Sequence, residues 1–252
     1  MLNNYKFLAI IPARGGSKRL PRKNILNLCG KPLIAWTIEA GKKSKYIDKV
    51  VVSSDDDEIL DIANEHKVTV LKRPDHLAKD TSKTFDVIKH VIDNAESYDY
   101  IVLLQPTSPL RNKNHVDAAI DFLFEKNADA VISVSETNHS PMWSNTLDES
   151  LSMKNFLKAE VLNKRSQELE KYYRLNGSIY ICKTNKLLRE KSFFLKDNIF
   201  AFKMDKECSV DVDEEAVKVP VPTFKVPAAD TEIASSAVKV VAAISIVPSK
   251  TD

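Results

Sequence analysis

Segments with strand-like and helix-like patterning alternate through the first 135 residues, and this alternation limits the folds open to the chain. Short apolar runs predict strands, and between them apolar residues recur at helical spacing. Such alternation is typical of an open α/β fold with a mostly parallel central sheet and helices on both faces. The predicted strands cover 6–11, 49–55, 68–74, 100–109 and 128–135, and the predicted helices cover 31–43, 57–66, 82–95 and 115–126.

The loops that follow the strands are where we expect a site, because ligands of such sheets bind beyond the carboxyl ends of the strands. These loops are 12–24, 53–57, 73–82 and 105–113.

The remainder of the chain departs from this regular pattern. Residues 138–173 are polar, charged and weakly periodic, so we interpret them as an excursion from the sheet that serves in dimerisation. Strand character returns at 177–183 and 199–204. After Glu215, three prolines fall within eight positions, which excludes a helix and disfavours a central strand. We therefore predict one domain over 1–215 and an atypical tail over 216–252.

The composition excludes several classes of partner. A net charge of +2 argues against bulk attraction to nucleic acid or to a membrane surface. The apolar runs are too short to span a bilayer, and the first residues lack the organisation of a signal peptide. The cysteines are odd in number and widely separated, which is typical of reduced thiols in the cytoplasm; they are Cys29, Cys182 and Cys208.

The loop after the first strand concentrates positive charge on a flexible turn. Paired glycines, Gly15 and Gly16, let backbone N–H groups approach a ligand closely, and fixed amides with several cations suit a polyphosphate. The pattern is neither a Walker loop nor a dinucleotide fingerprint. A solvated basic turn is the alternative interpretation. The cations are Arg14, Lys18, Arg19, Arg22 and Lys23.

Four stretches of the chain together resemble the motifs of one enzyme family. "PARGGSKRLPRKN" (12–24) is similar to the first motif of the cytidylyltransferases that activate nonulosonic acids, above all the CMP-N-acetylneuraminate synthetases. "LLQPTSPLR" (103–111) is similar to their second motif, and "RLNGSIYI" (174–181) and "SVDVD" (209–213) to their third and fourth. The order and spacing also match over about residues 5–215. The resemblance implies a Rossmann-like nucleotidyltransferase fold and a homodimer.

In the family, the anomeric hydroxyl of the sugar attacks the α-phosphate of CTP and releases pyrophosphate. By resemblance, Arg14, Lys18 and Lys23 hold the triphosphate within the loop that contains Gly15, Gly16 and Ser17, and Asn24 makes a neighbouring nucleotide contact. Arg19 and Arg22 fall at positions that the motif leaves variable. The resemblance implies cytidine contacts from the second nucleotide loop, through Arg73, Asp80 and Ser82.

The second and third motifs imply the sugar site. An amide such as that of Gln105 both donates and accepts, which suits a sugar with hydroxyl and amide groups. Thr107, Ser108 and Arg111 would contact the acidic sugar or support the loop, although "PTSP" is also a common proline-bracketed turn. The resemblance adds Asn176, Tyr180, Phe193 and Phe194, and core packing is the alternative for the two phenylalanines.

Two further roles follow from the resemblance. An arginine from the partner subunit reaches the sugar carboxylate in the family; its position falls at Ser166 here, with Arg165 adjacent. Asp211 and Asp213 alternate, so on a regular strand both would face one side and could hold Mg²⁺. The ion would neutralise the α-phosphate and help deprotonate the attacking hydroxyl, with Arg14, Lys23 and Asp211 as the catalytic residues.

The sequence leaves other substrates and one other class open. The same chemistry on legionaminic, pseudaminic or KDO-type acids is the near alternative, and a nucleotide-binding homologue without turnover is the distant one. The five histidines do not pair for zinc, and no nucleophile elbow occurs.

Overall fold

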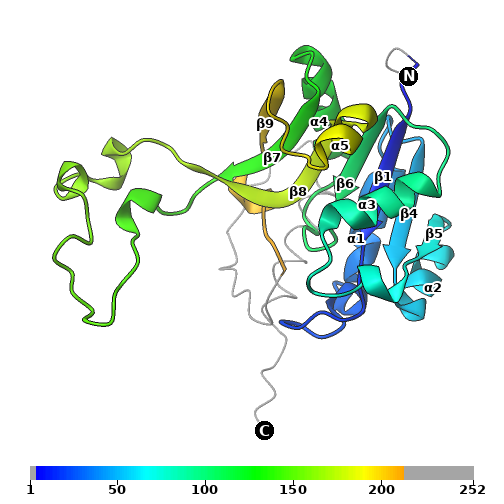
Figure 1. Ribbon diagram of the computed structural model, residues 1–252, viewed down its shortest axis with the longest axis horizontal. Helices are drawn as coiled ribbons and strands as arrows, with labels where there is room; N and C mark the ends of the chain where they lie inside the picture. The colour runs from blue at the N-terminus through cyan, green and yellow to red at the C-terminus, as the bar shows by residue number, and fades with distance from the viewer. Residues whose placement is uncertain (1–3, 213–252) are drawn as a thin grey trace, which may run out of the picture.

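A seven-stranded sheet with helices on both faces forms the body of the protein in the computed structural model, which describes residues 4–212 (Figure 1). The strand order is β5-β4-β1-β6-β8-β7-β9, and only β8 runs antiparallel to its neighbours among the paired strands of this sheet. This confirms the predicted α/β class and the mostly parallel sheet. The strands of the sheet are β1 (Phe7–Pro12), β4 (Lys49–Ser54), β5 (Thr69–Lys72), β6 (Tyr100–Leu104), β7 (Ala130–Glu136), β8 (Tyr173–Lys183) and β9 (Ile199–Lys203).

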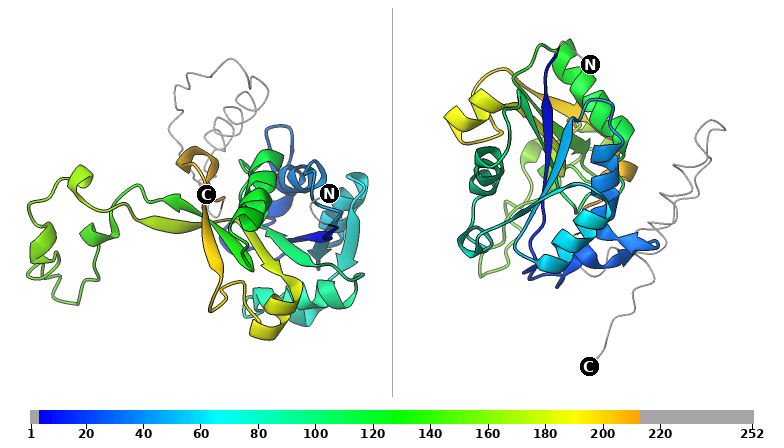
Figure 2. Two further views of the ribbon diagram at one scale, coloured as in Figure 1. Left: turned by 90° about the horizontal axis from the view of Figure 1, so that it is seen from above. Right: turned by 90° about the vertical axis from the view of Figure 1, so that its right-hand side faces the viewer.

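The helices cover both faces because the central strands are apolar on both sides. Alternate residues of β1 enter two separate cores, with Phe7, Ala9 and Ile11 in one and Leu8 and Ile10 in the other. The first core includes residues of α1 (Leu33–Lys42), α2 (Asp57–Glu65) and α4 (Lys113–Glu125). The second includes residues of α3 (Thr84–Asp93) and α5 (Thr184–Glu190), so these helices lie on the opposite face (Figure 2).

Two small elements have no counterpart in the sequence prediction. A two-stranded ribbon of β2 (Asn27–Leu28) and β3 (Lys31–Pro32) follows the basic loop. Helix α5 has seven residues and buries one of them, Leu187, so it carries too little apolar periodicity to stand out.

The antiparallel strand β8 determines which segments meet at the edge of the sheet. Its pairing with β6 places Leu104 opposite Ile179 and Tyr100 opposite Lys183. The first half of β8 therefore lies beside the carboxyl end of β6. This register brings the third family motif next to the second.

The segment between β7 and β8, residues 137–172, projects away from the sheet (Figures 1 and 2). It contains only short 3-10 helices, at Pro141–Trp143, Ala159–Val161 and Ser166–Glu168. Large apolar side chains stay exposed on it, including Leu151 at 69% and Met153 at 62%. We call this segment the arm.

The regular strand on which Asp211 and Asp213 would face one side is not formed in the described part of the fourth motif. After β9 the backbone forms a 3-10 helix, Lys206–Cys208, and residues 209–212 are irregular. The Ser209 N–H donates to the carbonyl of Lys206, and the Ser209 hydroxyl donates to that of Asp205, so local turn bonds replace sheet pairing. Asp213 and the tail 216–252 lie outside the described residues.

Two thiols behave as apolar groups. Burial raises the pKa of Cys182 to about 12 and that of Cys208 to about 11, so both stay protonated at neutral pH. Within residues 4–212, none of the helices combines the length and the apolar character needed to cross a membrane.

Candidate functional site

The loops that follow β1, β4, β5 and β6 meet at one edge of the sheet. Hydrogen bonds join the first three, from Ala13 N to Ser53 O at 3.0 Å and from Arg73 N to Ser54 O at 2.6 Å. The segment 209–212 closes the other side, because Val212 N donates to Thr107 O at 2.8 Å.

The basic loop reaches the fourth motif directly. The ammonium group of Lys23 lies 3.5 Å from the carbonyl oxygen of Val212, a contact between residues 189 positions apart. The two charged regions that the sequence analysis treats as one site therefore lie side by side in the fold, with Asp211 adjacent to this contact.

Backbone contacts hold the start of the basic loop. Asp55 Oδ1 accepts from Gly15 N at 3.2 Å, and the buried Asn24 donates from Nδ2 to Arg14 O at 3.0 Å. A side chain at Gly15 would place Cβ 2.9 Å from Asp56 Cβ, so no larger residue fits there. At Gly16 the corresponding space is open, which leaves the backbone accessible to a ligand. Ser17 N bonds Gly15 O at 3.0 Å and tightens the turn.

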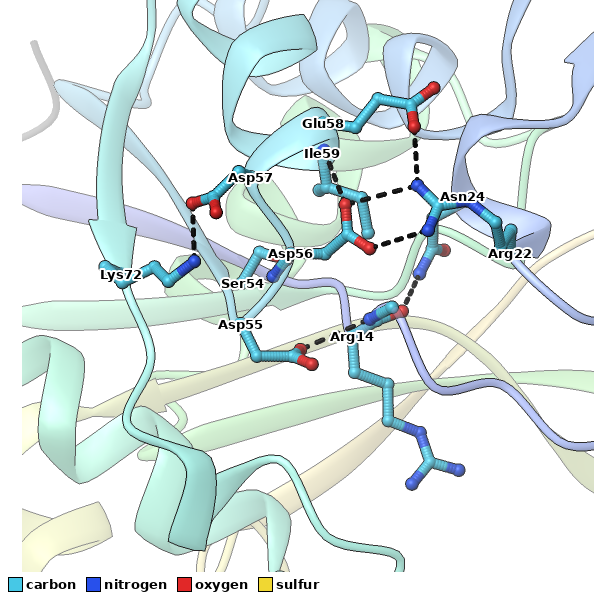
Figure 3. Close-up of polar contacts among 11 residues, drawn as sticks. Arg14, Arg22, Asn24, Ser54, Asp55, Asp56, Asp57, Glu58, Ile59 and Lys72 are labelled. Carbon is cyan, nitrogen blue, oxygen red and sulfur yellow. Dashed lines mark hydrogen bonds and ion pairs between the residues drawn. The ribbon is translucent and has the colours of Figure 1, made fainter.

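The cations of the loop divide between two acidic partners. Arg14 and Lys18 both contact Asp80, at 2.7 Å and 2.5 Å, and hydrogen bonds from Lys18 and Arg14 hold the pKa of that carboxyl below its usual value. Arg22 turns the other way, toward Asp56 and Glu58 (Figure 3). Arg14 extends away from this acidic segment in the same view.

The loop 73–82 contains two of the predicted cytidine contacts, Arg73 and Ser82, and both side chains form hydrogen bonds within the protein. Arg73 is buried, and it donates from Nη2 to Ser53 O at 2.7 Å and from Nε to Ser53 Oγ at 3.3 Å. Burial, with a smaller contribution from the charge of Arg14, lowers its pKa to about 10. Ser82 donates from Oγ to His76 O at 3.1 Å. Arg73 therefore braces the carboxyl end of β4 from inside.

The loop after β6 is a buried turn with one side chain facing β8. Gln105 Oε1 lies 2.7 Å from where a Cβ of Gly177 would stand, and Gly177 has a φ of +70°, so the amide rests on a position that only glycine suits. Ser108 is fully buried, while Thr107 is half-buried and uses its carbonyl to bind Val212.

Arg111 is a support of this loop. Its guanidinium is fully buried and donates to Gln105 O at 3.2 Å, Ser178 O at 3.0 Å and Thr37 Oγ1 at 2.5 Å. Burial lowers its pKa to about 9. Of the two roles that the sequence leaves open, the geometry matches support of the loop, since the side chain is not accessible to a sugar.

Asn176 connects three segments through a buried network. Its Oδ1 accepts from Ser133 Oγ at 2.6 Å and Ser178 N at 3.1 Å, and its Nδ2 donates to Ser209 Oγ at 3.0 Å. Tyr180 is half-buried, and burial together with the charge of Asp211 raises the pKa of its phenol. The structure therefore brings Asn176, Tyr180 and Asp211 to the same end of the sheet.

The two adjacent phenylalanines separate. The Phe193 ring packs edge-on against Tyr180 at 5.8 Å between centroids and belongs to the second core, which matches the core-packing alternative. Phe194 is 55% exposed and lines a surface pocket with Arg189, Glu190, Lys196 and Asp197, none of which belongs to the predicted site.

Arg165 is not brought to this site within the same chain. It lies exposed on the arm, which projects away from the body, and its N–H donates to Glu168 Oε2 at 2.9 Å.

Sequence reasoning missed the acidic segment after β4. "DDDE" (55–58) begins at the carboxyl end of a predicted strand, which is the available signal, but its partners become visible only in the fold. Ser133, Ser209 and Thr37 were missed as well, because nothing in their local sequence indicates a buried hydrogen-bond network.

The sheet order and the loops at its carboxyl edge define a nucleotidyltransferase fold. The structure described as "CMP:2-keto-3-deoxy-manno-octonic acid synthetase complexed with CTP" shares this fold with a TM-score of 0.62 at 19% identity, over 83% of this chain and 93% of that chain.

The chain belongs to the cytidylyltransferase family. The family model described as "Cytidylyltransferase" matches residues 8–224. The N-acylneuraminate cytidylyltransferase of Streptococcus agalactiae serotype V is 38% identical over 82% of this chain, and the matched region covers 50% of that protein. The CMP-N,N'-diacetyllegionaminic acid synthase of Legionella pneumophila is 40% identical over 75% of this chain and 83% of its own length. The chain thus spans about half the length of the N-acylneuraminate relatives it matches.

Proposed function

We propose that this protein transfers CMP from CTP to the anomeric hydroxyl of a nonulosonic acid and releases pyrophosphate. N-acetylneuraminic acid is the favoured substrate. The observation that carries the proposal is the contact between Lys23 and Val212, because it joins the cationic loop to the acidic motif that the reaction requires together.

The cations support binding and departure of the triphosphate. Arg14 and Lys18 share the carboxylate of Asp80 at the surface, and a phosphate oxygen presents the same kind of acceptor. Exchange of Asp80 for the β- and γ-phosphates would place both cations on the pyrophosphate leaving group. Positive charge there stabilises the negative charge that develops in the transition state.

The sugar would lie between the loop after β6 and the first half of β8. The amide of Gln105 and the phenol of Tyr180 offer donors and acceptors there, and Phe193 backs the Tyr180 ring. Arg111 and Asn176 act from beneath by fixing the backbone of Gln105 and Ser178.

A magnesium ion fits the donor chemistry at Asp211. Within residues 4–212, no group of three or more His, Cys, Asp or Glu side chains is arranged so that it could hold a metal ion. Mg²⁺ needs only one or two carboxylates beside phosphate oxygens and water, so Asp211, with the predicted Asp213, would be sufficient. When bound, the ion would supply charge neutralisation at the α-phosphate. Asp211 is half-buried close to Tyr180, which is where a carboxylate could also accept the proton of the sugar hydroxyl.

Pyrophosphate release tests the reaction. The protein is incubated with CTP, Mg²⁺ and, in turn, N-acetylneuraminic, legionaminic, pseudaminic and KDO acids. We expect release with N-acetylneuraminic acid and its loss in Asp211→Asn. Release with another acid only would name that substrate, and CTP binding without release with any acid would favour the homologue without turnover.

We also propose a homodimer formed through the arm. Leu147, Leu151, Met153 and Leu162 are exposed there, and an apolar surface on a projecting segment is stabilised when a second copy covers it. Light scattering should give twice the chain mass, and a monomer at micromolar concentration would contradict this. Use of CTP and the reduced thiols of Cys182 and Cys208 support a cytoplasmic location.

A further inference from the structure

Arg22 contacts Asp56 and Glu58, whereas Arg14 and Lys18 of the same loop contact Asp80. Its backbone adopts a left-handed conformation, with φ of 55° and ψ of 25°. Its guanidinium meets both oxygens of Asp56, at 3.1 Å and 3.4 Å, and Glu58 Oε2 at 2.6 Å. The next residue, Lys23, extends instead to Val212. The left-handed backbone at Arg22 therefore lets the Arg22 side chain anchor the loop while the Lys23 side chain enters the site.

Asp56 is the centre of this arrangement. Its carboxylate caps α2 by accepting from Ile59 N at 3.2 Å, and its own N–H donates to Ser54 Oγ at 3.0 Å. The side chain is only 15% exposed, and it lies where a side chain at position 15 would collide with it. One carboxylate thus contacts both ends of the loop, near Gly15 at its start and Arg22 at its return.

These contacts fasten the return of the basic loop to a rigid element, helix α2. Helix α2 packs on the first core through Ile59 and Ala63, so Asp56 has a firm base. Cations that must meet a triphosphate lose affinity when their backbone is disordered, because binding then includes the cost of ordering the loop.

We propose that Asp56, acting through Arg22 with Glu58 beside it, is a positioning residue that orders the basic loop for the triphosphate of CTP. Arg22 is then an anchor and makes no phosphate contact. The proposal rests on the proposed function, since it presumes that CTP binds at this loop.

The variant Asp56→Asn distinguishes the role of the ion pair from that of the helix cap. Asn caps helices about as well as Asp, so Asp56→Asn keeps the acceptor for Ile59 N while it removes one of the two carboxylate charges that hold Arg22. Arg22→Met removes the same pair from the other side and leaves the cap untouched.

Isothermal titration with CTP measures the effect. We expect Asp56→Asn and Arg22→Met each to raise the Kd for CTP by about tenfold, because binding then includes the cost of ordering the loop. The double variant should be no weaker than the weaker single variant, because both changes break one interaction. Arg22→Lys, which keeps a cation for Asp56, should recover part of the affinity. In turnover assays KM for CTP should rise while kcat changes by less than about threefold, because bound triphosphate orders the loop.

Asp57→Asn is the matched control. Asp57 is the neighbouring carboxylate on the same helix, 84% exposed and paired with Lys72, so its loss should leave the Kd for CTP unchanged. Unchanged or tighter CTP binding in Asp56→Asn, with weaker binding in Arg22→Met, would make Arg22 a direct phosphate ligand and overturn the proposal. Additive losses in the double variant, or wild-type affinity in both singles, would overturn it too. Failure of the wild-type protein to bind CTP would overturn the proposed function as well.

Discussion

Arg14 and Arg111 follow neighbouring strands of one sheet, β1 and β6, yet their guanidinium groups meet opposite surroundings. Arg14 is about one-third exposed and faces the carboxylate of Asp80, a partner on a separate loop. Arg111 is fully buried among carbonyl and hydroxyl oxygens of Gln105, Ser178 and Thr37. The first arginine can exchange its partner for an incoming anion, whereas the second has no accessible surface with which to do so.

The difference teaches that one edge of the sheet contains two kinds of loop. The loop after β1 carries charge to the surface and depends on neighbouring acids for its shape. The loop after β6 is built around an internal cation and depends on burial. Substitutions should therefore affect ligand binding in the first loop and stability in the second.

The largest effect is expected from Arg111→Met. Removal of the guanidinium leaves three buried acceptors without their donor and should lower the free energy of unfolding by about 3 kcal/mol. For a chain of this size that corresponds to a fall in Tm of about 10 °C, measurable by calorimetry. Arg189→Met, an exposed arginine on α5, is the control and should change Tm by less than about 2 °C. Wild-type stability with lost sugar binding would show instead that Arg111 reaches the substrate.

Arg14→Met should lower activity and leave the free energy of unfolding nearly unchanged, the reverse of the pattern expected for Arg111→Met. If Arg14 binds the leaving pyrophosphate as proposed, its loss should lower kcat/KM for CTP by about 10²-fold, while Tm stays close to that of the wild type. Steady-state kinetics and a thermal scan on the same sample give both values. Lys89→Met, an exposed cation on α3, is the matched variant. A large loss of stability in Arg14→Met would remove the contrast between the two loops.

Asp80→Asn should change nucleotide affinity in the opposite direction. The carboxylate occupies Arg14 and Lys18, so its neutralisation frees both cations and should tighten CTP binding by roughly threefold, as measured by titration calorimetry. Asp93→Asn, which removes a comparable exposed partner of Lys89, should have no effect on CTP. Weaker binding in Asp80→Asn would show that Asp80 itself contacts the nucleotide, as the family resemblance implies.

The smallest effect concerns the pH dependence of stability near Arg111. Burial and the charge of Arg111 lower the pKa of His115, whose Nδ1 accepts from Asn112 N at 3.2 Å. The unfolded chain takes up the proton first as the pH falls. The contribution is thus complete above the unfolded pKa of about 6.5 and is lost progressively below it. Wild-type protein should lose on the order of 1 kcal/mol or less between pH 7.5 and 5.5, and His115→Gln should lose less.

Urea unfolding at the two pH values measures this difference. His139→Gln, on the arm, serves as the control and should follow the wild type. Equal pH dependence in His115→Gln and wild type would mean that the buried loop does not sense the charge on this imidazole.

Much of the body could be predicted from the sequence because each central strand is apolar on both faces and each helix has one apolar face. The helix predicted over 82–95 illustrates this, since Ile88 and Val91 are buried in the second core as its spacing indicates. The antiparallel direction of β8 could not be predicted, because a strand's local pattern does not encode its direction. The short α5 has a single buried residue and gives no periodic signal.

The candidate site was predictable in location and less so in the roles of its residues. The order of the motifs places charged loops at the carboxyl edge, and the fold brings Lys23 to Val212 there. Whether an arginine is a ligand or a brace depends on its burial, which is decided by residues far along the chain such as Thr37 and Ser178 for Arg111. The fourth motif does not form a regular strand in its described part because Ser209 bonds locally to Asp205 and Lys206.

The bond between Val212 and Thr107 has a consequence for the order in which the protein is made. Residues 209–212 leave the ribosome after almost all of the described chain, and closing so long a loop is an entropically late event in folding. A growing polypeptide would therefore carry its basic loop well before the residues that close the other side of the candidate site. We accordingly expect the nascent chain to reach its full affinity for nucleotide only after residues 209–212 have been synthesised.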